Sequence, residues 1–127
     1  MPLACACTVT ITGDLARMLK PDQPTRETLP LTFIGKPNNR RRPIPTPISR
    51  NSPVLVTGDS HTLVFHIGQD MHAVGAGLPD QLAAELGIEV ALIGVRGSGA
   101  TAARINLYRK VRANPGYLKN KKALVWC

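Results

Sequence analysis

The second half of the chain alternates compact apolar runs with longer stretches of mixed polarity. The apolar runs are rich in β-branched residues and are typical of buried strands. They are PVLVT at 53–57, IEVALIGV at 88–95 and KKALVWC at 121–127. The stretches between them have helical periodicity and predict two helices. These are GLPDQLAAELG at 77–87, with Pro79 near its start and Gly87 at its stop, and ATAARINLYRKVRA at 100–113.

The order of these elements predicts the fold class. Strand, helix, strand, helix, strand at short spacing is typical of an α/β fold with a right-handed parallel sheet. We expect the second helix to turn Ile105, Tyr108 and Val111 inward and its arginines outward. Because the sequence stops directly on the third strand, we expect the α/β part to be a portion of a larger domain.

The first half of the chain is less regular. Residues 1–20 form a short N-terminal element, with a strand predicted over TVTIT at 8–12 and a short helix after Asp14. Residues 21–52 contain repeated prolines, which remove backbone donors and forbid a sustained helix. We therefore expect a Pro/Arg-rich linker or an irregular wrapping loop over 21–52, followed by the α/β part over 53–127.

The charges are unevenly distributed. The formal net charge is +8, and every acidic residue lies at or before Glu89. The C-terminal third should therefore carry a positive field, which favours anionic partners such as nucleic acid, acidic polysaccharide or phosphorylated ligands; a solvated helix face is the alternative. The basic run at Arg40, Arg41 and Arg42 has no interleaved aromatic residue to stack on bases, so we expect no nucleic-acid partner.

Several other classes of protein are not supported. Cys5, Cys7 and Cys127 have no zinc-type spacing and do not make a disulfide framework, so we expect no metal and no cofactor. No apolar run approaches the roughly 20 residues of a membrane span, so we expect no integral membrane segment. The start of the chain lacks the basic region of a signal peptide, and the sequence does not determine the compartment.

The first predicted strand of the α/β part ends in an unusual turn within VLVTGDSHTLVF at 54–65. Ligands of open α/β sheets bind at the carboxyl ends of the strands. Gly58 permits a tight turn there, and Ser60 sits where a nucleophile would have backbone N–H groups and a histidine beside it. The alternative is that Ser60 only caps the helix that follows.

Histidines near this turn are candidates for a general base. His61, His66 and His72 fall within twelve residues. Asp70 and His72 make an Asp-x-His pair on a Gly-rich loop, in which the acid would orient the imidazole. His61, directly after Ser60, is a second candidate. The alternative is that each of these histidines is an ordinary polar residue of a loop.

The next predicted strand ends in a glycine loop. Its GSGATA portion at 97–102 fits the loose dinucleotide fingerprint, but the acid expected about 20 residues onward is replaced by the basic run Lys119–Lys122. Only an NADP-like 2′-phosphate would suit that run, which makes an NADP domain a distant alternative. Because the loops of adjacent parallel strands lie side by side, Gly97 can instead offer its N–H to an oxyanion over Ser60.

Three blocks together carry a family resemblance. VLVTGDSHTLVF, ALIGVRGSGATAARINL and KKALVWC resemble the SGNH hydrolase-like domain of the alginate O-acetyltransferases, the AlgJ/AlgX-related proteins, over roughly residues 53–127. The resemblance implies a three-layer, flavodoxin-like SGNH fold, here incomplete. It implies Ser60 as the nucleophile and the N–H groups of Ser60 and Gly97 as oxyanion donors. It also implies an acidic polysaccharide acceptor, an acetyl donor, membrane-complex partners and a periplasmic setting.

The position of the histidines departs from the resembled family. In that family the Asp-x-His pair lies upstream of the serine block, whereas no histidine precedes Ser60 here. Either Asp70 and His72 substitute locally, or the pair belongs to a segment ahead of this chain, which we favour. The expected function is serine O-acetyl transfer to an alginate-like polysaccharide. The alternatives are an SGNH esterase, which differs only in how water is excluded, and an inactive carbohydrate-binding remnant.

Overall fold

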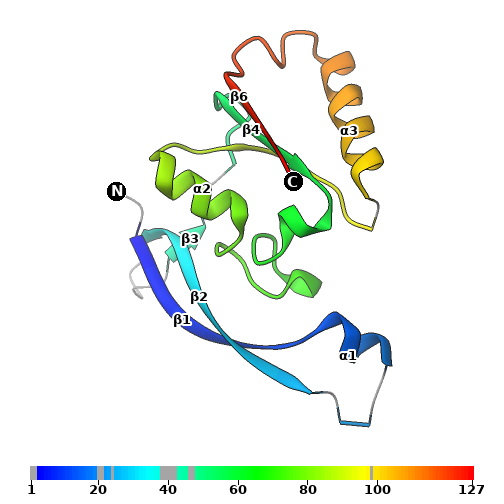
Figure 1. The fold of residues 1–127 in the computed structure, drawn as a ribbon. Coiled ribbons are helices and arrows are strands. Elements are labelled where there is room, and N and C mark those ends of the chain that lie inside the picture. The colour runs from blue at the N-terminus through cyan, green and yellow to red at the C-terminus, as the bar shows by residue number, and fades with distance from the viewer. Residues whose placement is uncertain (1–2, 20–21, 24, 38–42, 46–47, 98) are drawn as a thin grey trace.

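The computed structural model describes all of the chain except residues 1–2, 20–21, 24, 38–42, 46–47 and 98 (Figure 1). It is a mixed α/β structure with one parallel and one antiparallel sheet. In chain order the elements are β1 (Leu3–Thr12), α1 (Asp14–Leu19), β2 (Arg26–Pro37), β3 (Pro43–Pro45), β4 (Val54–Gly58), the 3₁₀ turns η1 (Ser60–Leu63) and η2 (Gln69–Met71), α2 (Leu78–Leu86), β5 (Ala91–Gly94), α3 (Ala100–Ala113) and β6 (Ala123–Trp126).

The parallel sheet has the strand order β5–β4–β6, which confirms the predicted parallel arrangement. The central strand β4 is the most buried part of the molecule, and Leu55, Val56 and Thr57 are at most 1% exposed. Successive side chains of a strand point to opposite faces of the sheet. A strand whose neighbouring residues are all buried must therefore be covered on both faces.

One helix covers each face of this sheet (Figure 1). Val56 packs against Ala83 of α2 on one face. Leu55 belongs to the cluster on the other face, where Leu107 and Val111 of α3 pack. The chain leaves β4 for β5 on one side and reaches β6 on the other side. In open α/β sheets, a reversal of this kind marks the place at the carboxyl ends of the strands where ligands bind.

The inward face of α3 differs from the prediction. Ile105 and Tyr108 are 43% and 63% exposed, so the expectation that they turn inward is wrong. The face that packs on the sheet instead carries Ala103, which is fully buried, together with Leu107 and Val111. These three residues are four positions apart and therefore share a helix face. The small side chain of Ala103 lets the helix approach the sheet, which the larger side chains would prevent.

The stretch 21–52, predicted as a Pro/Arg-rich linker or an irregular wrapping loop, contains the long strand β2. β2 pairs with β1 in an antiparallel ladder that runs from Leu3 opposite Gly35 to Thr12 opposite Arg26. The strand predicted at 8–12 and the helix after Asp14 are both present, and the strand begins earlier than predicted. The basic run at 40–42 lies outside the residues that the structure describes.

Pro30 is compatible with β2 because its nitrogen lies on the side of the strand that does not pair with β1. The N–H of Ile34 donates to the carbonyl oxygen of Gly75, and the carbonyl oxygen of Thr32 accepts from the side chain of Gln81. Backbone groups of alternate residues in a strand point to the same side. Pro30 therefore directs its nitrogen away from β1, as a strand proline requires.

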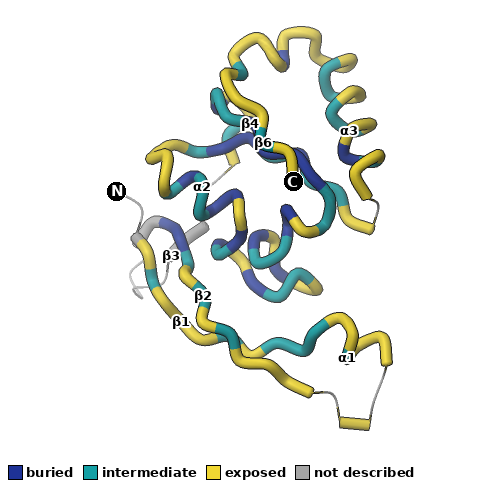
Figure 2. Tube along the Cα trace, in the orientation of Figure 1, coloured by how far each residue is buried: buried dark blue, intermediate teal, exposed yellow. Residues whose placement is uncertain are grey.

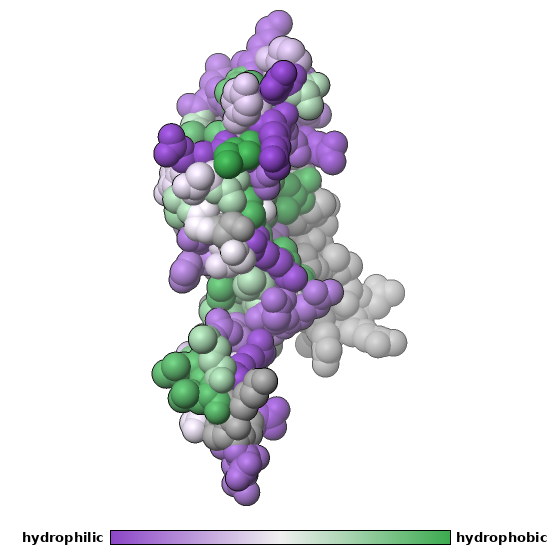
Figure 3. Space-filling model, turned by 90° about the vertical axis from the view of Figure 1, so that its right-hand side faces the viewer, coloured by the Kyte–Doolittle hydropathy of each residue, from purple (hydrophilic) through white to green (hydrophobic). Residues whose placement is uncertain are grey.

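The hairpin of β1 and β2 contributes little to the core. Figure 2 shows the buried segments gathered around β4 and α2, whereas β1 and α1 are mostly exposed. Ile34, at 4% exposed, is the point at which the hairpin enters the core. The apolar side chains of α1, Leu15, Met18 and Leu19, are at least 70% exposed, and Figure 3 shows an apolar group near this end of the molecule.

Two glycines allow η1 to fold tightly over the ends of β4 and β5. Gly58 and Gly94 are opposite one another in the ladder. A Cβ atom on Gly58 would overlap the Thr62 hydroxyl and lie 2.5 Å from the carbonyl oxygen of Cys127. A Cβ atom on Gly94 would overlap the side chain of Leu63. Both glycines are needed because a 3₁₀ turn packs directly on the strand ends.

We predict that Gly58→Ala destabilises the protein. The added methyl group meets a backbone carbonyl that cannot move without disturbing β6, so the free energy of unfolding should fall by about 2 kcal/mol or more. The matched control is Gly116→Ala, where the nearest atom to a Cβ is 3.5 Å away and the change should stay within about 0.5 kcal/mol. Urea unfolding followed by circular dichroism measures both variants; equal losses would contradict the explanation.

Candidate functional site

Ser60 is the first residue of η1, directly beyond the carboxyl end of β4. The cap of this turn is Asp59, whose Oδ1 accepts from the backbone N–H of His61 at 2.9 Å. The cap of this turn is therefore Asp59 and not Ser60, so the alternative in which Ser60 caps the following turn does not hold. Within the described residues, neither the hydroxyl nor the N–H of the half-buried Ser60 has a hydrogen-bond partner.

An acid and an imidazole flank Ser60. Oδ1 of Asp59 also lies 3.1 Å from Nδ1 of His61, whose side chain is 88% exposed. The backbone N–H of His61, and secondly its ring, hold the pKa of the Asp59 carboxyl below its ordinary value. The ionised carboxylate can orient the ring through Nδ1, which leaves Nε2 to exchange protons.

The glycine loop after β5 begins beside the serine turn. The N–H of Val95 donates to the carbonyl oxygen of Gly58 at 3.2 Å, which joins the starts of the two loops. Gly97 is exposed and has a left-handed backbone with φ of 68°. The predicted oxyanion donors Ser60 and Gly97 therefore lie on loops at the same edge of the sheet. Ser98, within the predicted fingerprint, lies outside the described residues.

Asp70 and His72 do not form the predicted pair. The Asp70 carboxylate accepts from Arg96 Nη2 at 2.6 Å, and Nε2 of His72 lies 4.0 Å from Oδ1 of Asp14. No hydrogen bond joins Asp70 to His72 in the part of the chain that the structure describes. His72 ends η2 with a left-handed φ of 72°, so the chain turns between the two side chains. The nearby guanidinium of Arg96 is the stronger partner for the carboxylate.

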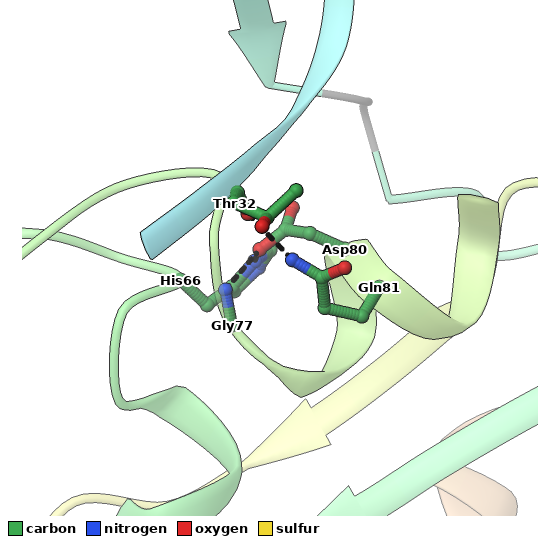
Figure 4. A network of polar contacts seen from close by, with 5 residues as sticks. All are labelled: Thr32, His66, Gly77, Asp80 and Gln81. Atoms are coloured by element: carbon green, nitrogen blue, oxygen red, sulfur yellow. Dashed lines mark hydrogen bonds and ion pairs between the residues drawn. The ribbon is translucent and has the colours of Figure 1, made fainter. Parts of the chain in front are cut away.

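The structure instead forms a buried pair that the sequence did not predict. Nδ1 of His66 lies 2.8 Å from Oδ2 of Asp80, and the two side chains are 8% and 1% exposed (Figure 4). The same carboxylate oxygen accepts from the backbone N–H of Gly77 at 3.0 Å, at the start of α2. The sequence contains one local signal for this contact: Asp80 lies three residues after Gly77 at the predicted start of the helix, where an acid commonly accepts from the backbone N–H of the cap residue. Its partner His66 is fixed only by the tertiary structure.

The His66–Asp80 pair stands where α2 meets the hairpin. Figure 4 shows Gln81, the next residue of α2, directed at Thr32 of β2, and its Nε2 donates to the Thr32 carbonyl oxygen at 2.5 Å. A Cβ atom on Gly77 would come within 2.7 Å of the His66 Cβ, so the backbone is packed tightly there. Because Asp80 also serves the helix start, we assign this pair a structural role.

Comparison of the chain with protein-family models, with curated proteins and with solved structures finds no match. In the described ranges, no three His, Cys, Asp or Glu side chains are close enough together to hold a metal ion. None of the helices there has the length and apolar character needed to cross a membrane. The site is therefore interpreted from its own geometry.

We predict that Asp80→Ala strongly destabilises the protein. The substitution leaves the buried His66 ring and the Gly77 N–H without an acceptor, which should lower the free energy of unfolding by about 3 kcal/mol. Glu85→Ala, an exposed acid on the same helix, is the control and should change stability by no more than about 0.5 kcal/mol. A small loss for Asp80→Ala in urea unfolding would show that the pair is not an anchor.

We predict that Asp59 stabilises the fold in a pH-dependent way. Its folded pKa lies below the ordinary value of 3.8, so its contribution is present above pH 3.8 and is lost as the pH falls through the lowered folded pKa. Asp59→Asn keeps a cap acceptor but removes the charge. The stability difference between the two proteins, from urea unfolding at a series of pH values, should therefore shrink in acid; a difference independent of pH contradicts this.

Proposed function

We propose that this chain is the serine-bearing part of an SGNH-type domain, of the three-layer flavodoxin-like kind, which transfers acetyl groups to a polysaccharide through an acetyl-serine. One observation carries the proposal. Asp59 takes the capping role, so the hydroxyl and the N–H of Ser60 are both without a partner among the described residues at the carboxyl end of β4. A free hydroxyl beside free backbone donors is what acyl transfer requires of a serine.

The proposed reaction has two half-reactions. The Ser60 oxygen attacks the carbonyl carbon of an acetyl ester, its proton passes to a histidine, and the alcohol of the donor leaves with a proton. A sugar hydroxyl then attacks the acetyl-serine and gives its proton to the base, and Ser60 is restored with a proton. The N–H groups of Ser60 and Gly97 are the proposed donors to the oxyanion that forms in each step.

His61 is better supported as the base than His72. Its Nδ1 is held 3.1 Å from the Asp59 carboxylate, in the acid–imidazole arrangement of a general base. Nε2 of His72 instead faces Asp14 at 4.0 Å, and its ring lies 5.9 Å from that of Phe65. We therefore propose that Asp59, Ser60 and His61 act together.

The positive charge of the chain supports an anionic acceptor. The formal net charge is +8. Arg96 at the edge of the sheet near Ser60 is already paired with Asp70, so the attraction would come from the net charge of the whole chain. An acidic polysaccharide of the alginate kind would be attracted to a chain of this net charge. A second candidate, an inactive carbohydrate-binding domain, is favoured by the separate partners of Asp70 and His72. An esterase would use the same residues with water as acceptor.

Acetylation by p-nitrophenyl acetate tests the proposal. We expect an acetyl group on the peptide that contains Ser60, no such group in Ser60→Ala, and a rate lower by about 100-fold in His61→Ala, the loss typical of a general base. Ser49→Ala and His72→Ala are the controls and should react like the wild type. Peptide mapping by mass spectrometry is the measurement, because free cysteines also react with active esters.

The outcome separates the candidate functions. Loss of the adduct on addition of alginate oligosaccharide, with acetyl recovered on the sugar, supports transfer, whereas recovery of free acetate supports the esterase. A folded wild-type chain that leaves Ser60 unmodified contradicts both enzymatic functions. Retained binding of alginate by that chain would then favour the inactive binding domain.

A further inference from the structure

A hollow of about 550 Å³ lies at the opposite end of the parallel sheet from Ser60. It is bounded by the turn that precedes β4, by the last turn of α3 and by the loop that leads to β6. Because the strands are parallel, this is the edge at which they begin, whereas Ser60 lies where β4 ends. The polar residues that line the hollow are Arg50, Asn51, Arg109, Lys110, Asn114 and Asn120.

The hollow collects positive charge without a compensating acid. No acidic residue lines it, and in the described part of the chain Arg50, Arg109 and Lys110 are in no ion pair. In Figure 3 the upper end of the molecule carries many hydrophilic residues together with some apolar groups. The negative end of the α3 dipole explains a basic residue in its last turn. It does not explain Arg50, which comes from a different segment and faces the same hollow.

Part of the wall of the hollow is held in place by contacts within the protein. Nζ of Lys121 donates to the carbonyl oxygens of Arg50 at 2.6 Å and Ser52 at 2.7 Å, which holds the turn that carries Arg50 and Asn51. The same ammonium group lies 4.9 Å from the centre of the Tyr117 ring, and that of Lys110 lies at 5.6 Å. Tyr117 is 9% exposed and packs in the core, so it anchors both lysines.

The neutral lining residues are suited to hydroxyl groups. An asparagine amide both donates and accepts hydrogen bonds, as a sugar hydroxyl does. Asn51, Asn114 and Asn120 each contribute one amide, and Asn114 is oriented because its Oδ1 accepts from the N–H of Gly116 at 3.2 Å. The volume falls in the range of sites for small molecules.

We infer that this hollow binds an anionic sugar of one to two rings, with its carboxylate or phosphate between Arg50, Arg109 and Lys110 and its hydroxyls at the asparagines. Arginine forks match carboxylate and phosphate oxygens in two-point contacts. The site is separate from the serine turn and does not depend on the proposed function. A ligand held at this edge is out of reach of Ser60, so the site would recruit or sense the sugar and take no part in acyl transfer.

Calorimetric titration of the whole chain tests this inference with four probes. Digalacturonate carries carboxylates, glucose 6-phosphate carries a phosphate, maltose is neutral, and inorganic phosphate has no sugar. We expect one of the two charged sugars to bind and maltose not to bind; whichever binds identifies the anionic group. Arg109→Gln should weaken that binding by about 10- to 100-fold, as the loss of a charged hydrogen bond does.

Arg112→Gln is the matched control. It removes the same charge from the same helix, and both arginines are exposed, but Arg112 does not line the hollow. A loss of at most about twofold is therefore expected after screening by salt. Asn51→Ala, which changes no charge, should also weaken binding and serves if Arg109→Gln does not fold. Equal losses in Arg109→Gln and Arg112→Gln would overturn the site in favour of a general positive field. Failure of both charged sugars to bind, or equally tight binding of inorganic phosphate, would overturn the assignment to a sugar.

Discussion

The burial of β4 on both faces is the constraint on which the rest of the structure depends. Leu55 lies on the face of the strand that packs against α3, and Val56 lies on the face that packs against α2. The Thr57 hydroxyl is satisfied by the carbonyl oxygen of Ile93 at 3.1 Å, so even the polar residue of the strand holds its neighbour. β5 and β6 pair with the two edges of β4, and the two helices cover its two faces. Solvent is therefore reached only by the residues that precede and follow the strand.

The two ends of β4 carry different chemistry for a reason that lies in the backbone. Beyond the carboxyl end, the turn η1 begins, and its first N–H groups have no partner within the turn. At the amino end, α3 has just finished, and its last carbonyl groups favour positive side chains. Ser60, whose hydroxyl and N–H have no partner among the described residues, therefore stands at one edge, and Arg109 and Lys110 stand at the other. Arg50 joins them from the turn before β4, and the end of α3 does not account for it. The sheet keeps the proposed acyl-transfer site and the proposed sugar site apart.

Much of the α/β part could be predicted because its signals are local. Apolar runs give the three parallel strands, and Gly87 ends α2 in the left-handed conformation expected of a helix stop. The strand β2 was not predicted because proline is unusual inside a strand. The tertiary structure shows why Pro30 is tolerated: its nitrogen points away from β1, toward the side of β2 on which α2 lies. The inward face of α3 was misjudged because the larger apolar side chains were favoured over Ala103, whose small size sets the helix-to-sheet distance.

The sequence by itself determined that Ser60 follows a buried strand in a tight turn, since strand periodicity and turn residues are properties of neighbouring positions. The tertiary structure decided the partners of the charged groups around it. Asp70 is two positions from His72 in the sequence, but its carboxylate is paired with Arg96. His66 pairs with Asp80 of α2, fourteen positions away in the sequence. Whether two side chains form an ion pair or a hydrogen bond depends on their distance in the folded protein and on their burial. A local sequence pattern does not predict which distant residues the fold brings within 3 Å of one another.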